Sequence, residues 1–199
     1  MTTPLTQAQT MILSALELYQ VLDFESTLLE VQKLVYLMQR LREPFPGLTF
    51  GKVIYGPFTP QLNHLLFDLE GRYLTGIKFH EAKPFDPIDL MAGKEAELEA
   101  ARQKLKPTSR ERLQTLAGLI EGFESPLGME LLATVDWVMN ADAAALHDAD
   151  LTCKGVQEWR LEGETQPVLR KKMVLTPHHI SVAPRRLLAF SAHLYAPRS

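Results

Sequence analysis

Most of the chain repeats apolar side chains at intervals of three and four residues, which places them on one face of an α-helix. Residues 27–41 are the clearest case, with Ser26 in position to cap the helix. Apolar side chains recur along one face, whereas Glu30, Lys33 and Arg40 fall on the other and are expected to face solvent. The same spacing predicts further helices over residues 8–21, 60–70, 94–105, 107–123, 126–139, 152–162 and 177–190.

Two short segments depart from the helical pattern. Residues 48–56 are rich in β-branched and aromatic side chains, which favours a strand, and residues 76–82 are a second candidate. We therefore predict a mainly α fold: a compact multi-helix domain with a small two-stranded β element around 48–55 and 76–81. Residues 1–199 are expected to form one domain.

Composition narrows the setting of this domain. The chain has 199 residues, 46% of them hydrophobic, which is enough for a core without disulfides or metals. Cys153 is the single cysteine, and the sequence shows neither a signal peptide nor an apolar run long enough to cross a membrane. We expect a cytoplasmic protein with no membrane partner.

Charge is distributed unevenly along the chain. Residues 111–164 carry eleven acids and three bases, a net charge of −8. Beyond Glu164 the chain has no Asp or Glu, and its charged residues are all basic: Arg170, Lys171, Lys172, Arg185, Arg186 and Arg198. Contacts with phosphates need cations, so we do not expect direct nucleic-acid binding by the acidic segment. Such a segment suits a basic partner, or it is a solvated surface that aids solubility.

Familiar catalytic and metal-binding patterns are missing from the sequence. His147, Asp148 and Asp150, like the adjacent pair His178 and His179, lack the spacing of a helical zinc site, so no metal is predicted. No phosphate-binding loop or dinucleotide fingerprint is present, so no cofactor is predicted.

The carboxylates of Glu121 and Glu124 could share a proton, but the sequence shows no second polar cluster beside them. Cys153 is expected to pack at a helix start rather than to act as a nucleophile. We therefore predict no catalytic residue and no enzymatic activity.

Two stretches are candidates for recognition. In "LIEGFESPLGMELLATVDWVM" (119–139), Gly122 can end one helix and Ser125 can cap the next, which leaves the two acids of the break unexplained. In "VIYGPFTPQL", the side chains of Tyr55, Pro57 and Phe58 precede a helix and form either a packed turn or a recognition edge.

Three segments carry a family resemblance: "LEVQKLVYLMQ", "YGPFTPQLNHLLFDLEGRYLTG" and "LIEGFESPLGMELLATVDWV". Together they resemble the C-terminal domain of DarG, the antitoxin of the DarT/DarG toxin–antitoxin pair. The first two are also similar to Panacea (SocA-like) antitoxin domains. The resemblance covers about residues 25–190, and the Glu-Gly-Phe-Glu-Ser-Pro block is its most specific part.

This resemblance implies a role and a partner. DarT-like toxins are ADP-ribosyltransferases that modify bases in single-stranded DNA. DarG proteins oppose them with a macrodomain that removes ADP-ribose and a C-terminal domain that binds the toxin. The sequence shows no macrodomain signature, so we do not carry hydrolase activity over; the chain is an excised domain or a natural protein without that half. The implied partner is a cognate DarT-like transferase.

A toxin that holds single-stranded DNA needs a basic groove with stacking surfaces. We expect part of the acidic segment 111–164 to fill that groove, with Glu121, Phe123 and Glu124 as the first interface candidates and the Tyr55 turn as the second. If Phe123 belongs to the core, as its helical spacing suggests, only the two carboxylates remain. Alternatively, apolar contacts block the toxin and the charges only steer its approach.

A different class of function also stays open. The SocA-like similarity favours a protease adaptor or a DNA-binding regulatory domain. A DNA-recognition helix is expected to carry cations, and residues 60–70 contain no lysine or arginine. This composition argues against the DNA-binding alternative.

Overall fold

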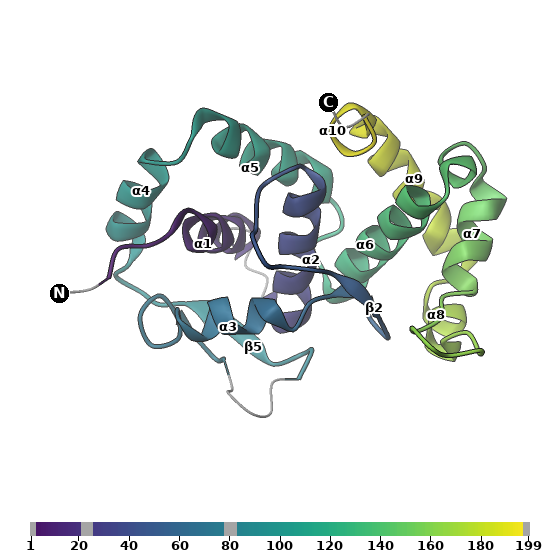
Figure 1. Cartoon of the computed structure of the whole chain (residues 1–199), viewed down its shortest axis with the longest axis horizontal. Helices are drawn as coiled ribbons and strands as arrows, with labels where there is room; N and C mark the ends of the chain where they lie inside the picture. Colours follow the sequence, from purple (N-terminus) through teal and green to yellow (C-terminus); the bar gives the residue numbers. More distant parts are fainter. Residues whose placement is uncertain (1–2, 21–25, 78–82, 197–199) are drawn as a thin grey trace.

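A computed structural model describes residues 3–20, 26–77 and 83–196 (Figure 1). Two helices that pack against each other form its centre, α2 (Leu28–Arg40) and α6 (Pro126–Ala141). Helices α1 (Gln7–Gln20) and α5 (Pro107–Ile120) pack on α2, whereas α7 (Ala149–Gln157) and α9 (Pro177–Ala189) pack on α6. The predicted mainly α fold class is confirmed.

Shorter elements complete the structure around this centre. Helix α3 (Gln61–Phe67) follows the hairpin described below, and α4 (Glu95–Gln103) packs on α1. The 3-10 helix η1 (Ala143–Leu146) joins α6 to α7, and α8 (Leu169–Val174) and α10 (Ser191–Leu194) flank α9 in sequence. No helix within the described ranges combines the length and the hydropathy needed to cross a bilayer.

Strand β2 (Gly51–Val53) lies inside the predicted strand, but its partner differs from the expected one. It pairs antiparallel with β3 (Gly56–Phe58), and the loop between them is Ile54 and Tyr55. The φ angle of Gly56 is +93°, so the chain can reverse at once, and a short loop closes at lower entropic cost than a distant pairing. Gly76 and Ile77 belong to no strand, and residues 78–82 lie outside the described residues.

A second small sheet has the strand order β1 (Ser26–Thr27), β5 (Pro87–Leu90), β4 (Leu74–Thr75). Both pairings are antiparallel, and Ser26 lies opposite Ile88. The hydroxyl of Ser26 donates to the carbonyl of Ile88 at 2.7 Å, so it serves this sheet and does not cap α2. Thr27 is the N-cap residue, and its amide donates to the Glu30 carboxylate at 2.7 Å.

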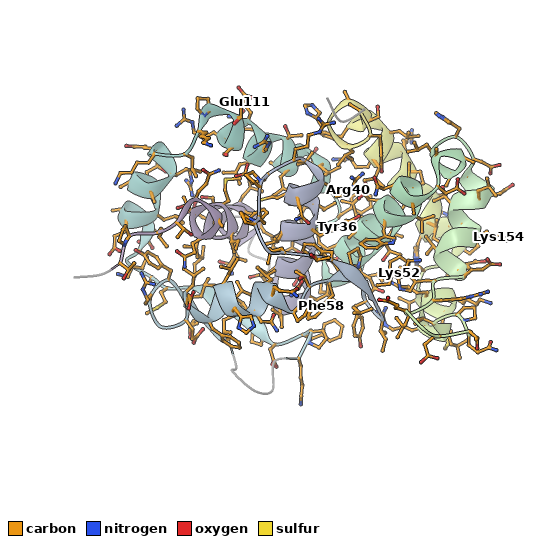
Figure 2. All side chains as sticks on the ribbon, in the orientation of Figure 1. Tyr36, Arg40, Lys52, Phe58, Glu111 and Lys154 are labelled. Carbon is orange, nitrogen blue, oxygen red and sulfur yellow. The ribbon has the colours of Figure 1, made fainter. Side chains whose placement is uncertain are left out.

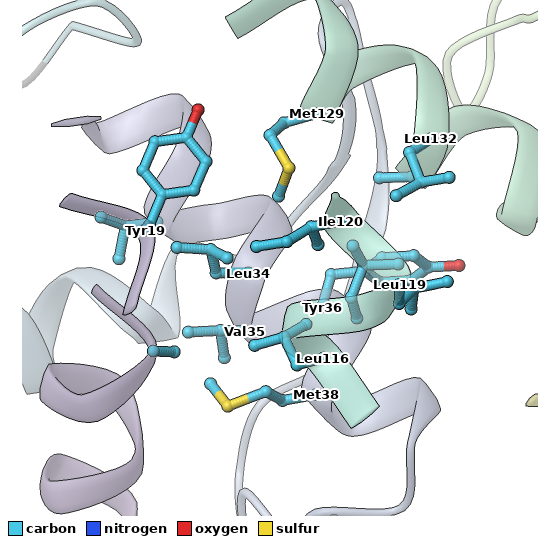
Figure 3. Close-up of a cluster of buried hydrophobic side chains, with 14 of the residues drawn as sticks. Tyr19, Leu34, Val35, Tyr36, Met38, Leu116, Leu119, Ile120, Met129 and Leu132 are labelled. Carbon is cyan, nitrogen blue, oxygen red and sulfur yellow. The ribbon is translucent and has the colours of Figure 1, made fainter. Parts of the chain in front are cut away.

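The main hydrophobic core lies where α1, α2, α5 and α6 meet (Figure 3). Leu34 and Val35 of α2 are buried against Leu116 and Ile120 of α5, with Met129 at the start of α6. These apolar positions of α2 are the ones that the sequence pattern places on its inner face. Because this core joins α5 and α6 to α1 and α2, it holds the α5–α6 corner in place, and the β2–β3 hairpin packs on α2 and α6 through β3.

Candidate functional site

The corner between α5 and α6 has the local structure that the sequence predicts. Helix α5 ends at Ile120, and the φ angle of Gly122 is +83°, which reverses the chain. The Ser125 hydroxyl accepts a hydrogen bond from the Gly128 amide at 3.0 Å and caps α6, whose first residue is Pro126. The corner is therefore a rigid support for the side chains between the two helices.

The two acids of the corner have different surroundings. The Glu121 side chain is 77% exposed, and its carboxylate lies 3.6 Å from the Arg186 guanidinium on α9. The Glu124 carboxylate accepts a hydrogen bond from the Gly122 amide at 2.6 Å, so it also stabilises the turn. Glu121 is the more available of the two for a partner.

Phe123 belongs to the core, as its helical spacing indicates. Its side chain is buried, and its backbone lies directly against Gly128, where an added Cβ would be 2.5 Å from the Phe123 carbonyl oxygen. The ring is thus unavailable for stacking in a nucleic-acid cleft. Of the first three interface candidates, only the carboxylates of Glu121 and Glu124 face outward.

Internal ion pairs lower the surface charge of the acidic segment. Glu130 is buried and bonds to Arg170 and Lys171 of the basic tail. Asp136 is buried and accepts hydrogen bonds from three side chains at 2.7 Å, those of Tyr36, Arg40 and Tyr195. Two of the eleven acidic side chains are therefore buried and paired within the fold. The formal net charge of −8 is more negative than the charge that the surface of this segment presents to a partner. Other acids remain exposed: Glu111, Asp142, Asp148, Asp150, Glu158, Glu162 and Glu164.

The second set of candidates lies on the β2–β3 hairpin. Pro57 is buried, whereas Tyr55 and Phe58 are half-buried. The Tyr55 ring has the Arg170 guanidinium 4.5 Å from its centre on one side and the Phe85 ring 5.3 Å away, edge to face, on the other. The hairpin therefore combines a packed turn at Pro57 with an accessible aromatic edge at its tip.

A groove of about 350 Å³ adjoins this edge. Its walls come from the first turns of α2, the hairpin, Pro84 and Leu161, and they are almost entirely apolar. Figure 2 shows Phe58 at the hairpin beside α2. We call this feature the hairpin groove.

Buried charged groups lie beneath the hairpin, where the sequence pattern does not predict them. Lys33 is buried there, and Glu30 is buried on the side of α1, where the Tyr19 hydroxyl bonds to it, so the expectation that both face solvent is wrong. The Lys33 amine donates to the Pro57 carbonyl at 2.7 Å, and the Lys171 amine donates to Glu130 at 2.8 Å and Thr134 at 2.9 Å. Helix periodicity alone cannot reveal this cluster, because its members come from three separate helices.

Burial lowers the pKa values of both lysines. The pKa of Lys33 falls to about 7, mainly through desolvation and further through the nearby Lys171 cation, with Glu130 partly opposing the shift. The pKa of Lys171 falls to about 8, because desolvation outweighs the favourable charge and hydrogen bond of Glu130. Both amines thus lose protons at a lower pH in the folded chain than in the unfolded chain.

Replacing Lys33 with methionine is expected to flatten the dependence of stability on pH. Between the folded pKa values and the ordinary lysine value of 10.5, both lysines bind fewer protons in the folded state than in the unfolded state. Stability therefore rises with pH in that window, by up to about 1.4 kcal/mol per pH unit for each lysine. Urea denaturation between about pH 8 and about pH 9.5 should give a slope near half that of the unmodified chain. The exposed Lys154→Met is the control, and a slope unchanged by Lys33→Met would contradict the burial of this amine.

The corner and the hairpin groove lie on different sides of the start of α2. The pKa of Tyr19 is raised mainly by burial and by its bonded partner Glu30, and the charge of Glu124 adds to the shift, which places the corner near these groups. Leu29 and Lys33, which line the groove, project from another face of the same helix. The two surfaces are therefore separate candidate sites.

Known proteins resemble the chain over most of its length. A protein named DNA ADP-ribosyl glycohydrolase from Thermus aquaticus is 34% identical over 173 residues, which cover 86% of this chain and 46% of that protein. Proteins of the same name from Mycobacterium tuberculosis and Mycobacterium bovis are 30% identical over 168 residues, or 80% of this chain and 44% of theirs. The chain is homologous to part of these proteins. It spans about half the length of each of them, and no family model matches it.

This homology supports a relation to the DarG family and corrects one expectation. We predicted no enzymatic activity, but the relatives are named as enzymes, so that prediction is wrong. The prediction was based on the lack of familiar catalytic motifs, in a sequence that aligns with only part of each relative. Within the described ranges, no cluster of three or more His, Cys, Asp or Glu side chains is arranged to hold a metal.

Proposed function

We propose that this chain binds a DarT-like DNA ADP-ribosyltransferase and inhibits it by covering its DNA groove. The observation that carries the proposal is the homology to proteins named for cleaving ADP-ribose from DNA. An inhibitor of the transferase and an enzyme that removes its product both limit the same modification. The resemblance of the three sequence segments to the toxin-binding domain of DarG supports this assignment.

The α5–α6 corner is the surface that we assign to the toxin's groove. A groove that binds single-stranded DNA carries cations for the phosphates, and an exposed carboxylate can occupy a phosphate position. The buried Phe123 and the Ser125 cap hold the corner rigid, which lowers the entropic cost of presenting Glu121. Arg186 is the internal cation that a cation of the toxin would replace beside Glu121.

The double substitution Glu121→Lys and Glu124→Lys is expected to raise the dissociation rate of the complex by about a hundredfold or more. The reason is that each lysine would place a cation against the basic groove. Surface plasmon resonance with a catalytically inactive DarT-like transferase would measure both rate constants.

The matched control is Glu111→Lys with Glu158→Lys, which changes the net charge equally at exposed positions outside the corner. If the charges only steer the approach, both double variants will slow association and neither will speed dissociation. Equal dissociation rates for the two variants would therefore remove the corner from the interface. Failure of the unmodified chain to bind the transferase would overturn the proposed function itself.

The name of the relatives favours a second function, cleavage of the bond between ADP-ribose and DNA by this chain itself. The test is incubation of the chain with an ADP-ribosylated oligodeoxynucleotide, followed by mass spectrometry of the DNA. Loss of the ADP-ribose mass in proportion to enzyme concentration would assign the reaction to this chain. If the ADP-ribose stays on the DNA, the proposed function of this chain remains binding of the transferase.

A further inference from the structure

The Arg186 side chain links α9 to the end of α5. Its guanidinium donates a hydrogen bond to the Gly118 carbonyl and lies 3.6 Å from the Glu121 carboxylate. Helix α5 ends at Ile120, so the carbonyl groups of its last four residues, Gly118 among them, have no donor within the helix. A cation at this position also complements the negative end of the helix dipole. Glu121 is therefore only one of the groups that hold Arg186 at the end of α5.

Packing fixes the base of the Arg186 side chain. Ala183 and Leu187, on the same helix, are buried, and Arg186 itself is 27% exposed. Phe190 follows one turn later and lies directly against Gly118, where an added Cβ would be 3.1 Å from the ring. The close approach of α9 to the last turn of α5 therefore keeps the guanidinium beside the Gly118 carbonyl.

Glu121, in contrast, is able to change its partner. Its side chain is 77% exposed, and its distance of 3.6 Å from Arg186 is longer than a hydrogen bond. An exposed ion pair of this length adds little to the stability of a fold. A cation of a second protein can therefore take over the Glu121 carboxylate at low cost, while Arg186 keeps its bond to Gly118.

We propose that Arg186 is a built-in competitor that lowers the affinity of the α5–α6 corner for the cations of a binding partner. In the free chain the guanidinium neutralises part of the Glu121 charge. In a complex it stays near the carboxylate and repels the cation that has taken its place. A partner must then add further contacts around the corner, which disfavours basic proteins that offer charge alone. This inference rests on the proposed use of the corner and gives Arg186 a role in selecting the partner.

Arg185 provides a matched control on the same helix. It is exposed and carries the same charge as its neighbour. Successive residues of a helix project about 100° apart, so the Arg185 side chain leaves α9 in a different direction from Arg186. Removing either charge changes the net charge of the chain equally, but only Arg186 lies beside Glu121.

The rate of dissociation from a catalytically inactive DarT-like transferase, measured by surface plasmon resonance, tests the proposal. Arg186→Gln removes the charge and keeps an amide that can donate to the Gly118 carbonyl. We expect this variant to dissociate about two- to fivefold more slowly than the unmodified chain. Arg185→Gln should leave the dissociation rate unchanged. Arg186→Lys keeps a cation at the position and should resemble the unmodified chain.

The sign of the effect separates competition from structural support. If Arg186 only holds the corner in place, Arg186→Gln will speed dissociation, because the support is weakened. Faster or unchanged dissociation would therefore overturn the proposal, as would an equal effect of Arg185→Gln. In a Glu121→Gln background, Arg186→Gln should have no further effect, because the carboxylate for which the two cations compete is gone. An effect that persists there would also overturn the proposal.

A labelled hexaarginine peptide separates this inference from the proposed function. In fluorescence polarisation with the full chain, the peptide supplies cations without a transferase. Arg186→Gln should tighten its binding by about two- to fivefold, and Glu121→Gln should cancel that gain. If the peptide responds in this way but the transferase does not bind the unmodified chain, the proposed function fails and the competition stands. If Arg186→Gln gives no gain that depends on Glu121, the competition itself is overturned.

Discussion

Replacing Glu130 with alanine is expected to lower the free energy of unfolding by about 3–5 kcal/mol. The Glu130 side chain is 1% exposed and bonds to Lys171, which is fully buried, and to Arg170. Without this carboxylate, the Lys171 ammonium would be desolvated beside Lys33 with no counter-charge. Two buried cations that repel each other must then lose protons or open the structure to water. Urea denaturation at neutral pH measures the loss.

Two comparisons separate charge pairing from the mere removal of a side chain. Glu158→Ala removes an exposed acid and should change stability by no more than about 0.5 kcal/mol. Replacing Glu130 and Lys171 together with methionine should recover most of the loss, because an apolar pair of similar volume needs no counter-charge. A Glu130→Ala variant as stable as Glu158→Ala would show that Lys171 is already neutral or hydrated in the folded chain.

The sequence pattern predicted the central helices because apolar periodicity is strong where two buried helices meet. Residues 27–41 and the helix from Pro126 were predicted from their apolar spacing, and α2 and α6 occupy these positions, although the N-cap of α2 is Thr27 and not the predicted Ser26. The restart at Ser125 was predictable because a capping side chain and a proline at the first helical position are local signals. Such signals depend on the chain itself and not on distant partners.

The failures come from contacts between distant segments. The polar face of α2 was expected to meet solvent, but the hairpin covers Lys33, and Tyr19 of α1 bonds to the buried Glu30. The sequence of a helix does not show whether water or another segment of the chain forms the hydrogen bonds of a polar side chain. The strand partner was missed for a different, local reason: the reversal at Gly56 needs a positive φ angle, which a strand pattern does not encode.

The candidate site was predictable only where it depends on local geometry. A break between two helices faces outward, and Glu121 is exposed there, while the spacing of Phe123 correctly indicated burial. Pairing of Glu130 with the basic tail was not predictable, because forty residues of sequence separate Glu130 from Arg170. The prediction of no enzymatic activity failed because it was based on motifs in this chain alone. The chain aligns with only about half of relatives that are named as enzymes, and the sequence of one half cannot describe the activity of the whole relative.

Replacing Gly56 with alanine is expected to lower the free energy of unfolding by about 3 kcal/mol or more. The φ angle of +93° is strained for any residue with a Cβ, and the added carbon would lie 2.7 Å from the Thr134 hydroxyl and 3.6 Å from the Lys33 side chain. Thr134 is an acceptor for Lys171 and cannot move freely. The hairpin would have to lift away from α6.

Gly47→Ala is the matched control, because Gly47 has a φ angle of +82° and nothing within 4 Å of an added Cβ. It should lose only the backbone strain, about 1–2 kcal/mol, so the difference between the variants isolates the packing of the hairpin on α6. Lifting the hairpin would also expose the Lys33 amine, so the pKa of Lys33 in a folded Gly56→Ala variant should return toward 10.5. Equal losses for the two variants in urea denaturation would mean that the hairpin does not pack closely on α6, and that the buried lysines need another explanation.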